Sequence, residues 1–273
     1  MKVSVITTVY NRPEHFRLML AALAAQSRRP DEVVVADDGS DADTVSAMRA
    51  HADASPLPCV FVRQEKDGYG LAAARNLATR AATGDYLVFA DCDIALLPDA
   101  IENHLHLASP DRLLCGNRAL LGEDATARLF AARPAPTAAD WEAVWRTADA
   151  SHLPPTQAQF EHHSALRRWH LARPHKPKII GCHFSLFRDD VVRVNGFDEN
   201  FVGWGYEDDD FARRLYKIGV RPASVILAAR AMHLWHPSLA PQELKRHRDR
   251  PNRAYFRRWF VPAFCKNGLV KRP

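Results

Sequence analysis

The chain has 273 residues, 47% of them hydrophobic and 25% charged, which is enough apolar material for one large domain and excludes wholesale disorder. Its net charge of +5 is uneven, because the residues from Pro241 to the end carry a surplus of eight positive charges and the preceding 240 about three net negative charges. A nucleic-acid binder would have to act through that tail alone, so we expect no nucleic-acid partner.

Short β-branched runs alternate with longer helical patterns across the first half of the chain. This alternation predicts an α/β fold with a mostly parallel central sheet flanked by helices, and with loops at the carboxyl ends of the strands open to a ligand. Gly84 is expected at the C′ position that ends the third helix. The expected strands are 3–7, 32–36, 59–62 and 86–90, and the expected helices are 13–25, 43–51 and 71–82.

The second half begins with a stretch, about 122–178, in which the pattern loosens into Ala, Pro, His and Arg. We interpret it as an irregular or helical insertion that lies over the site near the acceptor side. The main domain is expected to span 1–240, and 241–273 to form a basic, aromatic tail. The later expected elements are an apolar run at 179–187, a short helix at 189–194, an amphipathic helix at 207–218 ended by Gly219, and a strand at 224–229.

Five cysteines make an odd count without a Cys-x-x-Cys pair, so reduced structural thiols are expected and a zinc knuckle is not. The apolar run at the N-terminus is too short for the core of a signal peptide, and no stretch is long enough to cross a bilayer. A cytoplasmic enzyme is the default expectation.

Asp91 and Asp93 are the strongest candidates for functional residues in the first half of the chain, because they follow an apolar strand that is expected to be buried. Two carboxylates two residues apart can converge on one hard cation, which prefers oxygen ligands. A divalent ion there would bridge a diphosphate and absorb charge as that group leaves. An acidic turn that only ends the strand explains the pair equally well when it is taken alone.

Residues 203–210 read Gly-Trp-Gly-Tyr-Glu-Asp-Asp-Asp, and four consecutive carboxylates repel one another unless they are solvated, capped or matched to a cation. The helix macrodipole accounts for one or two of them. It does not account for the glycines and aromatic residues before them, which are typical of a close-approach loop with a stacking wall at Trp204. A carboxylate beside a sugar-binding aromatic is suited to act as a general base on a hydroxyl.

His233 and His236 offer two imidazoles that could complete a coordination sphere begun by the aspartates, although either could equally be a structural residue. Polar residues also follow the first two expected strands, where a base and ribose could bind. Arg75 lies in the first two turns of a helix preceded by glycines, which suits an anion such as phosphate. Polar turns and solvated arginines are common, so each of these signals is weak alone.

The tail mixes basic and aromatic residues between Arg250 and Phe260. One interpretation is contact with an anionic membrane surface, which would bring the protein to lipid-linked acceptors. The other is an arginine-rich helix that packs its aromatic residues on the body. We prefer the second, because Pro251 and Pro262 confine any helix to a short length.

Together, the motifs in this sequence resemble those of the inverting glycosyltransferases of family two, which have the GT-A fold. The C-terminal half is similar to galactosyltransferase-type and chondroitin-polymerase-type members. The resemblance covers about Val3 to His236, apart from the insertion. The motifs that carry it are Thr8-Val9-Tyr10-Asn11, Asp37-Asp38-Gly39-Ser40, Ala74-Arg75-Asn76, Asp91-Cys92-Asp93, Gly203-Trp204-Gly205-Tyr206-Glu207-Asp208 and His233 to His236.

The resemblance implies a role for each matched position. Asp208 would be the catalytic base, and Glu207 would orient the acceptor beside it. Asp93 and His236 would be direct metal ligands, with Asp91 and His233 as further candidates. The donor-binding residues would be Thr8, Tyr10, Asn11, Asp38, Arg75, Asp91 and Trp204. His183 departs from the pattern, because an amide-type residue is expected at its position.

The function so implied is transfer of a hexose or N-acetylhexosamine from a UDP-sugar to a carbohydrate or lipid-linked saccharide acceptor, with inversion. Mn²⁺ or Mg²⁺ would be the cofactor. The enzyme would act in bacterial polysaccharide or glycoconjugate synthesis. The alternatives are a catalytically silent nucleotide-sugar-binding scaffold and a sugar nucleotidyltransferase. The latter would more typically have a glycine-rich, basic loop where this chain has Thr7 to Pro13.

Overall fold

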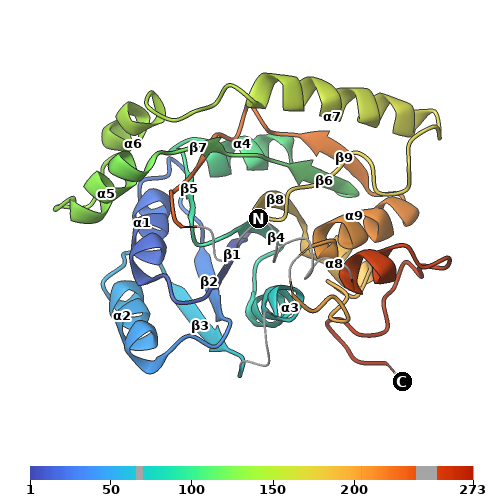
Figure 1. Ribbon diagram of the computed structural model, residues 1–273, viewed down its shortest axis with the longest axis horizontal. Helices are drawn as coiled ribbons and strands as arrows, with labels where there is room; N and C mark the ends of the chain where they lie inside the picture. Colours follow the sequence, from blue (N-terminus) through green and yellow to red (C-terminus); the bar gives the residue numbers. More distant parts are fainter. Residues whose placement is uncertain (66–69, 204, 238–250, 273) are drawn as a thin grey trace.

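The computed structural model describes residues 1–65, 70–203, 205–237 and 251–272, and a seven-stranded sheet lies at its centre (Figure 1). The strand order is β3-β2-β1-β4-β8-β6-β9, and a smaller sheet has the order β5-β10-β7. The strands are β1 (Val3–Val9), β2 (Glu32–Asp37), β3 (Cys59–Arg63), β4 (Tyr86–Ala90), β5 (Ile94–Leu96), β6 (Arg112–Cys115), β7 (Ala119–Leu120), β8 (His183–Phe187), β9 (Arg221–Ser224) and β10 (Ala231–His233).

The first four strands of the large sheet are parallel neighbours, while β8 runs antiparallel to both β4 and β6. Strands β1, β2 and β4 are buried along their whole length, as expected for parallel strands covered on both faces. The predicted mostly parallel sheet is therefore confirmed. Its carboxyl ends meet at one edge, where the polar residues that follow β1, β2 and β4 are gathered.

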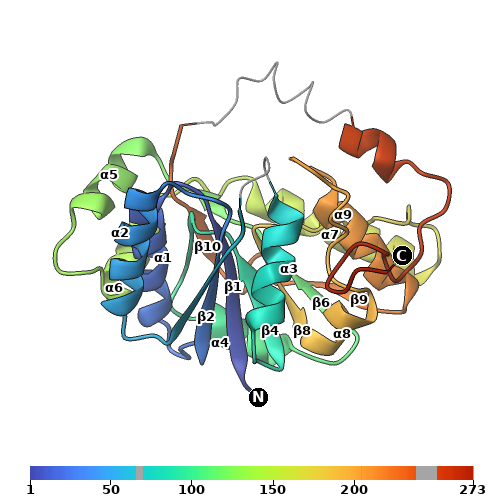
Figure 2. The same ribbon diagram turned by 90° about the horizontal axis from the view of Figure 1, so that it is seen from below.

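Helices cover both faces of this sheet (Figure 2). One face packs against α1, α2 and α4 through side chains such as Phe16 and Met48, and the other against α3, α8 and α9 through side chains such as Phe211. These helices are α1 (Pro13–Ala24), α2 (Ala42–Asp53), α3 (Leu71–Ala81), α4 (Ala100–Leu107), α8 (Arg188–Arg193) and α9 (Glu207–Lys217). Pro13 begins α1, where its missing N–H costs nothing.

The insertion is largely helical, and forms α5 (Glu123–Ala131), α6 (Ala138–Trp145) and α7 (Leu153–Arg168). Buried Trp141 joins a third apolar cluster with Leu18 of α1 and Met232 of β10, so α6 helps to hold the small sheet against α1. Helix α7 packs near β9 at the other end of the large sheet. The position of the insertion relative to an acceptor stays a prediction.

Two expectations about local structure are wrong. Helix α3 ends because Ala82 is extended, and Gly84 does not have the left-handed backbone of a C′ residue. Gly84 is required for close approach instead, since a Cβ there would lie 2.4 Å from Ser4 Oγ. The expected strand at 224–229 is also misplaced, because β9 ends at Ser224 and the N–H groups of Ala228 and Ala229 turn back to Val225 O.

All five cysteines are free thiols, three of them buried, as the odd count predicts. In the described part of the chain, no helix combines the length and the apolarity needed to span a membrane.

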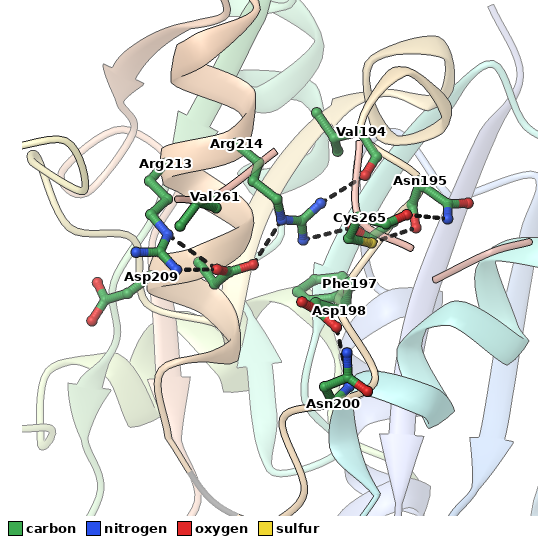
Figure 3. Close-up of polar contacts among 12 residues, drawn as sticks. Val194, Asn195, Phe197, Asp198, Asn200, Asp209, Arg213, Arg214, Val261 and Cys265 are labelled. Atoms are coloured by element: carbon green, nitrogen blue, oxygen red, sulfur yellow. Dashed lines mark hydrogen bonds and ion pairs between the residues drawn. The ribbon is translucent and has the colours of Figure 1, made fainter. Parts of the chain in front are cut away.

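The C-terminal segment (residues 251–272) packs on the body, and its polar contacts include those around Asn195 (Figure 3). Asn195 Nδ2 donates to Cys265 O at 2.7 Å and to Val270 O at 2.8 Å. The Phe256 ring faces the body, whereas Trp259 is fully exposed. The segment therefore packs some of its aromatic residues on the body and presents others to solvent.

Candidate active site

A carboxylate and two imidazoles converge where the two sheets meet. Asp93 directly precedes β5, and the antiparallel pairing of β5 with β10 brings His233 opposite Ile94. Asp93 Oδ2 lies 3.2 Å from His236 Nε2 and 3.7 Å from His233 Nε2. One ligand atom from each of the three residues lies within 4.8 Å of the others, which is close enough for one ion to contact all three.

The ionisation of this cluster suits a cation. Burial alone would raise the pKa of Asp93, but the hydrogen bond with His236 and the nearby His233 and Arg12 outweigh it and lower that pKa. Burial lowers the pKa of His233, which favours the neutral imidazole that a metal requires. The three residues therefore fit a divalent metal ion in geometry and in donor type.

Two residues beside this cluster were not predicted. Arg12 Nη2 lies 2.9 Å from His236 Nδ1, and Pro237 O lies 2.9 Å from the same nitrogen. His15 Nε2 lies 3.1 Å from Trp235 O. Both residues lie at the start of α1, directly after the polar loop that follows β1. Their position next to this loop was the sequence signal that could have identified them as site residues.

Arg75 joins the neighbouring groups into a second cluster. Its side chain is 3% exposed, and its guanidinium lies 3.2 Å from both Asp91 Oδ1 and Glu207 Oε1 and donates to Gly181 O at 2.9 Å. Asp91 thus faces Arg75 and is not one of the three converging ligands, so its direct metal role stays a prediction. The negative charge of Asp93 nevertheless acts on Asp91, so the two clusters are adjacent.

Each acid at the start of α9 has a distinct partner. Burial and the charge of Asp208 raise the pKa of Glu207 to about 7, although Arg75 opposes them, and Glu207 Oε2 has no hydrogen-bond partner among the described residues. Asp208 Oδ2 accepts from Gly181 N at 3.1 Å. Asp209 pairs with Lys178 at 3.0 Å. The fourth acid, Asp210, pairs with arginines, so the acidic run is matched to cations and N–H groups.

The loops after β1 and β2 form a third group at the same sheet edge. Buried Asp38 accepts from Gly70 N at 3.1 Å and from Gln64 Nε2 at 2.5 Å, so it is joined to the residues just before α3. Asn11 joins the two loops, because its N–H donates to Ser40 Oγ at 2.9 Å. Thr8 is buried at the end of β1, next to these loops, and Tyr10 is half-buried. Trp204 lies outside the described residues.

His183, the departure from the family pattern, belongs to the core below the site. Its Nδ1 lies 2.9 Å from Asn117 O, and its Nε2 lies 2.8 Å from Nε2 of buried His104. Burial lowers the pKa of His183 to about 4, so the ring is neutral near neutral pH. Gly116 is necessary beside it, since a Cβ there would lie 2.3 Å from the ring.

A largely parallel sheet with polar loops at its carboxyl edge, an acidic pair after β4 and imidazoles beside a second small sheet is the arrangement of a glycosyltransferase domain of the GT-A type. The model of glycosyl transferase family 2 matches residues 4–192, and that of the N-terminal domain of galactosyltransferase matches residues 161–237. The chain belongs to glycosyl transferase family 2, as its motifs predicted.

Its curated relatives include two enzymes of longer chain. It is 30% identical over 232 residues to the chondroitin synthase of Escherichia coli, covering 80% of this chain and 32% of that protein. It is 32% identical over 238 residues to the validoxylamine A glucosyltransferase of Streptomyces hygroscopicus subsp. limoneus, covering 80% of this chain and 48% of that protein. The chain thus spans about a third to a half of these relatives.

Solved structures share the fold. The mannosyltransferase PcManGT of Pyrobaculum calidifontis, in complex with GDP-Man and Mn²⁺, matches with a TM-score of 0.64 and 23% identity, covering 96% of this chain and 66% of that one. S. aureus TarS 1-349 in complex with UDP-GlcNAc matches with a TM-score of 0.57 and 16% identity, covering 96% of this chain and 69% of that one. At these identities the likeness establishes the GT-A fold.

Proposed function

We propose that this protein transfers a hexose or N-acetylhexosamine from a UDP-sugar to an acceptor hydroxyl with inversion of configuration, in bacterial polysaccharide or glycoconjugate synthesis. The observation that carries the proposal is the adjacency of two clusters, one of metal-ligand type (Asp93, His233 and His236) and one that links Asp91 through Arg75 to Glu207 of α9, next to Asp208. Glycosyl transfer needs both a stabilised diphosphate and a base for the acceptor.

Asp93, His233 and His236 would hold the divalent cation, which, when bound, offsets the negative charge of the departing diphosphate. Two imidazoles among three ligands suit Mn²⁺ better than Mg²⁺, which prefers an all-oxygen sphere with several waters. Arg12 lies next to this group and adds positive charge on the side where a diphosphate would bind.

Asp208 would take the proton from the acceptor hydroxyl, which then attacks the anomeric carbon directly, so that configuration inverts. Hydrogen bonds from the N–H groups of Gly181 and Asp209, at 3.1 Å and 2.7 Å, orient its carboxylate. Glu207 directly precedes Asp208 and pairs with Arg75 at 3.2 Å, and we propose that it orients the acceptor beside the base.

The donor nucleotide would lie along the carboxyl ends of β1, β2 and β4. We propose that Thr8 and Asp38 contact the uracil, that Tyr10 and Asn11 shape the loop around it, and that Asp91 and Arg75 lie near the ribose. TarS was solved with UDP-GlcNAc and PcManGT with GDP-Man, so both structures support a nucleotide-sugar donor, and TarS supports the choice of a UDP-sugar. Trp204 is proposed as the wall against the sugar.

The test is a screen of UDP-sugars with MnCl₂ and simple saccharide acceptors, scored by release of UDP. Mn²⁺-dependent UDP release that rises with an acceptor is the expected result. Donor binding without release would favour the catalytically silent scaffold. Release of pyrophosphate from a nucleoside triphosphate and a sugar phosphate would favour the nucleotidyltransferase instead.

We further propose a cytoplasmic protein that contacts the inner face of the membrane, where lipid-linked saccharide acceptors would be found. Trp259 and Phe260 are exposed in the same short segment of chain as exposed Arg253 and Arg257, which is a combination suited to anionic lipid. Co-sedimentation with phosphatidylglycerol vesicles, reduced by Trp259→Ser, is expected. Equal sedimentation of the variant would contradict this surface.

A further inference from the structure

The C-terminal segment reaches the loop that leads into α9, although it lies beyond residue 237, where the second family match ends. Asn252 Nδ2 donates to Gly205 O at 3.1 Å. The Phe256 ring lies 5.1 Å from the Tyr206 ring. These contacts join the segment to the two residues directly before Glu207.

This loop has a backbone that needs support from elsewhere. Gly203, Gly205 and Tyr206 have φ values of 87°, 99° and 70°, all in the left-handed region, which a tyrosine rarely adopts. Tyr206 is also the N-cap of α9 and makes no side-chain hydrogen bond to the helix. Because no side-chain cap sets the direction of the helix, external contacts such as those of Asn252 and Phe256 must contribute to it.

A buried charge network ties the first turn of α9 to the same segment. The Asp210 carboxylate is fully buried and pairs with Arg213 at 2.5 Å and Arg214 at 2.7 Å, both on α9 itself. Figure 3 shows these two arginines together with Asp198 of the preceding loop. Arg258 of the C-terminal segment lies 3.1 Å from both Asp210 Oδ1 and Asp198 Oδ2, so one guanidinium connects the helix to the loop before it.

We propose that Asn252, Phe256 and Arg258 of the C-terminal segment position the active site, and that Arg258 sets the orientation of the first turn of α9 and thereby of Asp208. The inference rests on the proposed role of Asp208 as base. The N–H of Gly181, which is not part of α9, donates a hydrogen bond to the Asp208 carboxylate. A shift of the first turn of α9 therefore changes the orientation of that carboxylate. A displacement of about 1 Å is enough to slow a reaction about a hundredfold.

Arg258→Met tests the proposal without unfolding the protein, because Asp210 keeps Arg213 and Arg214, and Asp198 keeps the Tyr255 hydroxyl at 2.8 Å. The matched control is Arg257→Met, which removes one exposed charge from the residue directly before Arg258. Hydrogen exchange measured by mass spectrometry should be at least fivefold faster at residues 205–210 in Arg258→Met than in Arg257→Met. Exchange in α1 should be the same in both.

Kinetics supply the second measurement, with UDP-N-acetylglucosamine and MnCl₂ as the probe donor. The kcat for UDP release should fall tenfold or more in Arg258→Met while the Kd for UDP stays within twofold, since Thr8 and Asp38, which we propose to contact the uracil, lie at the ends of β1 and β2 and not on α9. Arg258→Lys should restore most of the loss. Unchanged exchange at 205–210, or equal losses in kcat and UDP affinity, would overturn the proposal. If the wild-type protein releases UDP from no donor, the proposed function fails, and the exchange result alone decides whether the segment holds this turn.

Discussion

Replacing Arg75 with methionine removes the cation that lies between the nucleotide side and the acidic helix. The side chain is 3% exposed and pairs with Asp91 and Glu207, each at 3.2 Å. Removal of one partner from a buried ion pair typically costs about 3–5 kcal/mol, because the remaining charge stays desolvated. Asp91 keeps 30% of its side-chain exposure, so we expect the lower end, about 3 kcal/mol near pH 8.

The cost of this substitution should depend on pH. Burial raises the pKa of Asp91 to about 6 and that of Glu207 to about 7, and Arg75 opposes both shifts. Without Arg75, both folded-state values rise further above those of the unfolded chain, so the folded mutant binds more protons than the folded wild type. Wild type and mutant share the same unfolded-state pKa values, so their stabilities diverge only where their folded states bind different numbers of protons. The mutant therefore loses stability relative to wild type as pH rises through about 6 and 7, the folded-state pKa values of wild type, and the loss levels off above the raised values of the mutant.

Urea unfolding of wild type and Arg75→Met at about pH 5 and pH 8 measures this effect. The control is Arg80→Met, which removes a 40% exposed arginine from the same helix. A loss of about 3 kcal/mol corresponds to a fall in Tm of about 6–12 °C for a domain of this size. An equal loss at both pH values, or a larger one at pH 5, would refute the electrostatic reasoning.

Three further predictions follow from the site and the core. Asp93→Ala should weaken Mn²⁺ binding at least tenfold by isothermal titration calorimetry, because it removes the carboxylate of the three-ligand group; unchanged affinity would place the ion elsewhere. Asp208→Asn should bind UDP normally and lose about a hundredfold or more in turnover, and full activity would remove Asp208 from the role of base. Gly116→Ala should lose about 1–3 kcal/mol, because its Cβ would meet His183, whereas Gly122→Ala, with nothing within 4 Å, should lose much less; equal losses would contradict the packing argument.

The fold up to β4 was predictable because each of its elements carries its own local pattern, whereas β5, α4, β6 and β7 were not predicted. Strand β4 is a continuous apolar run with the predicted bounds, and α1 begins at Pro13 as expected. The segment at 224–229 failed because Val225 and Ala229 are buried through a turn, and burial alone does not distinguish a turn from a strand. The antiparallel direction of β8 depends on pairing across the sheet, which has no local signal.

The types of residue in the motifs indicated which residues lie near the candidate site, but their spacing in the sequence did not indicate which groups each one contacts. Asp91 and Asp93 look equivalent in sequence, but one faces Arg75 and the other faces two imidazoles, because β5 turns the chain toward β10 directly after Asp93. Arg12 was missed because its contact with His236 spans most of the chain. The docking of Arg258 on Asp210 likewise follows from the folded path of the chain and not from any motif.

The most direct test of the central claim is a crystal structure with UDP and Mn²⁺, in which anomalous scattering locates the ion. We predict one Mn²⁺ ion bound by Asp93, His233 and His236, in contact with the diphosphate and on the side of the site that faces Asp91. A manganese peak away from all three residues, with UDP bound elsewhere on the molecule, would contradict the account.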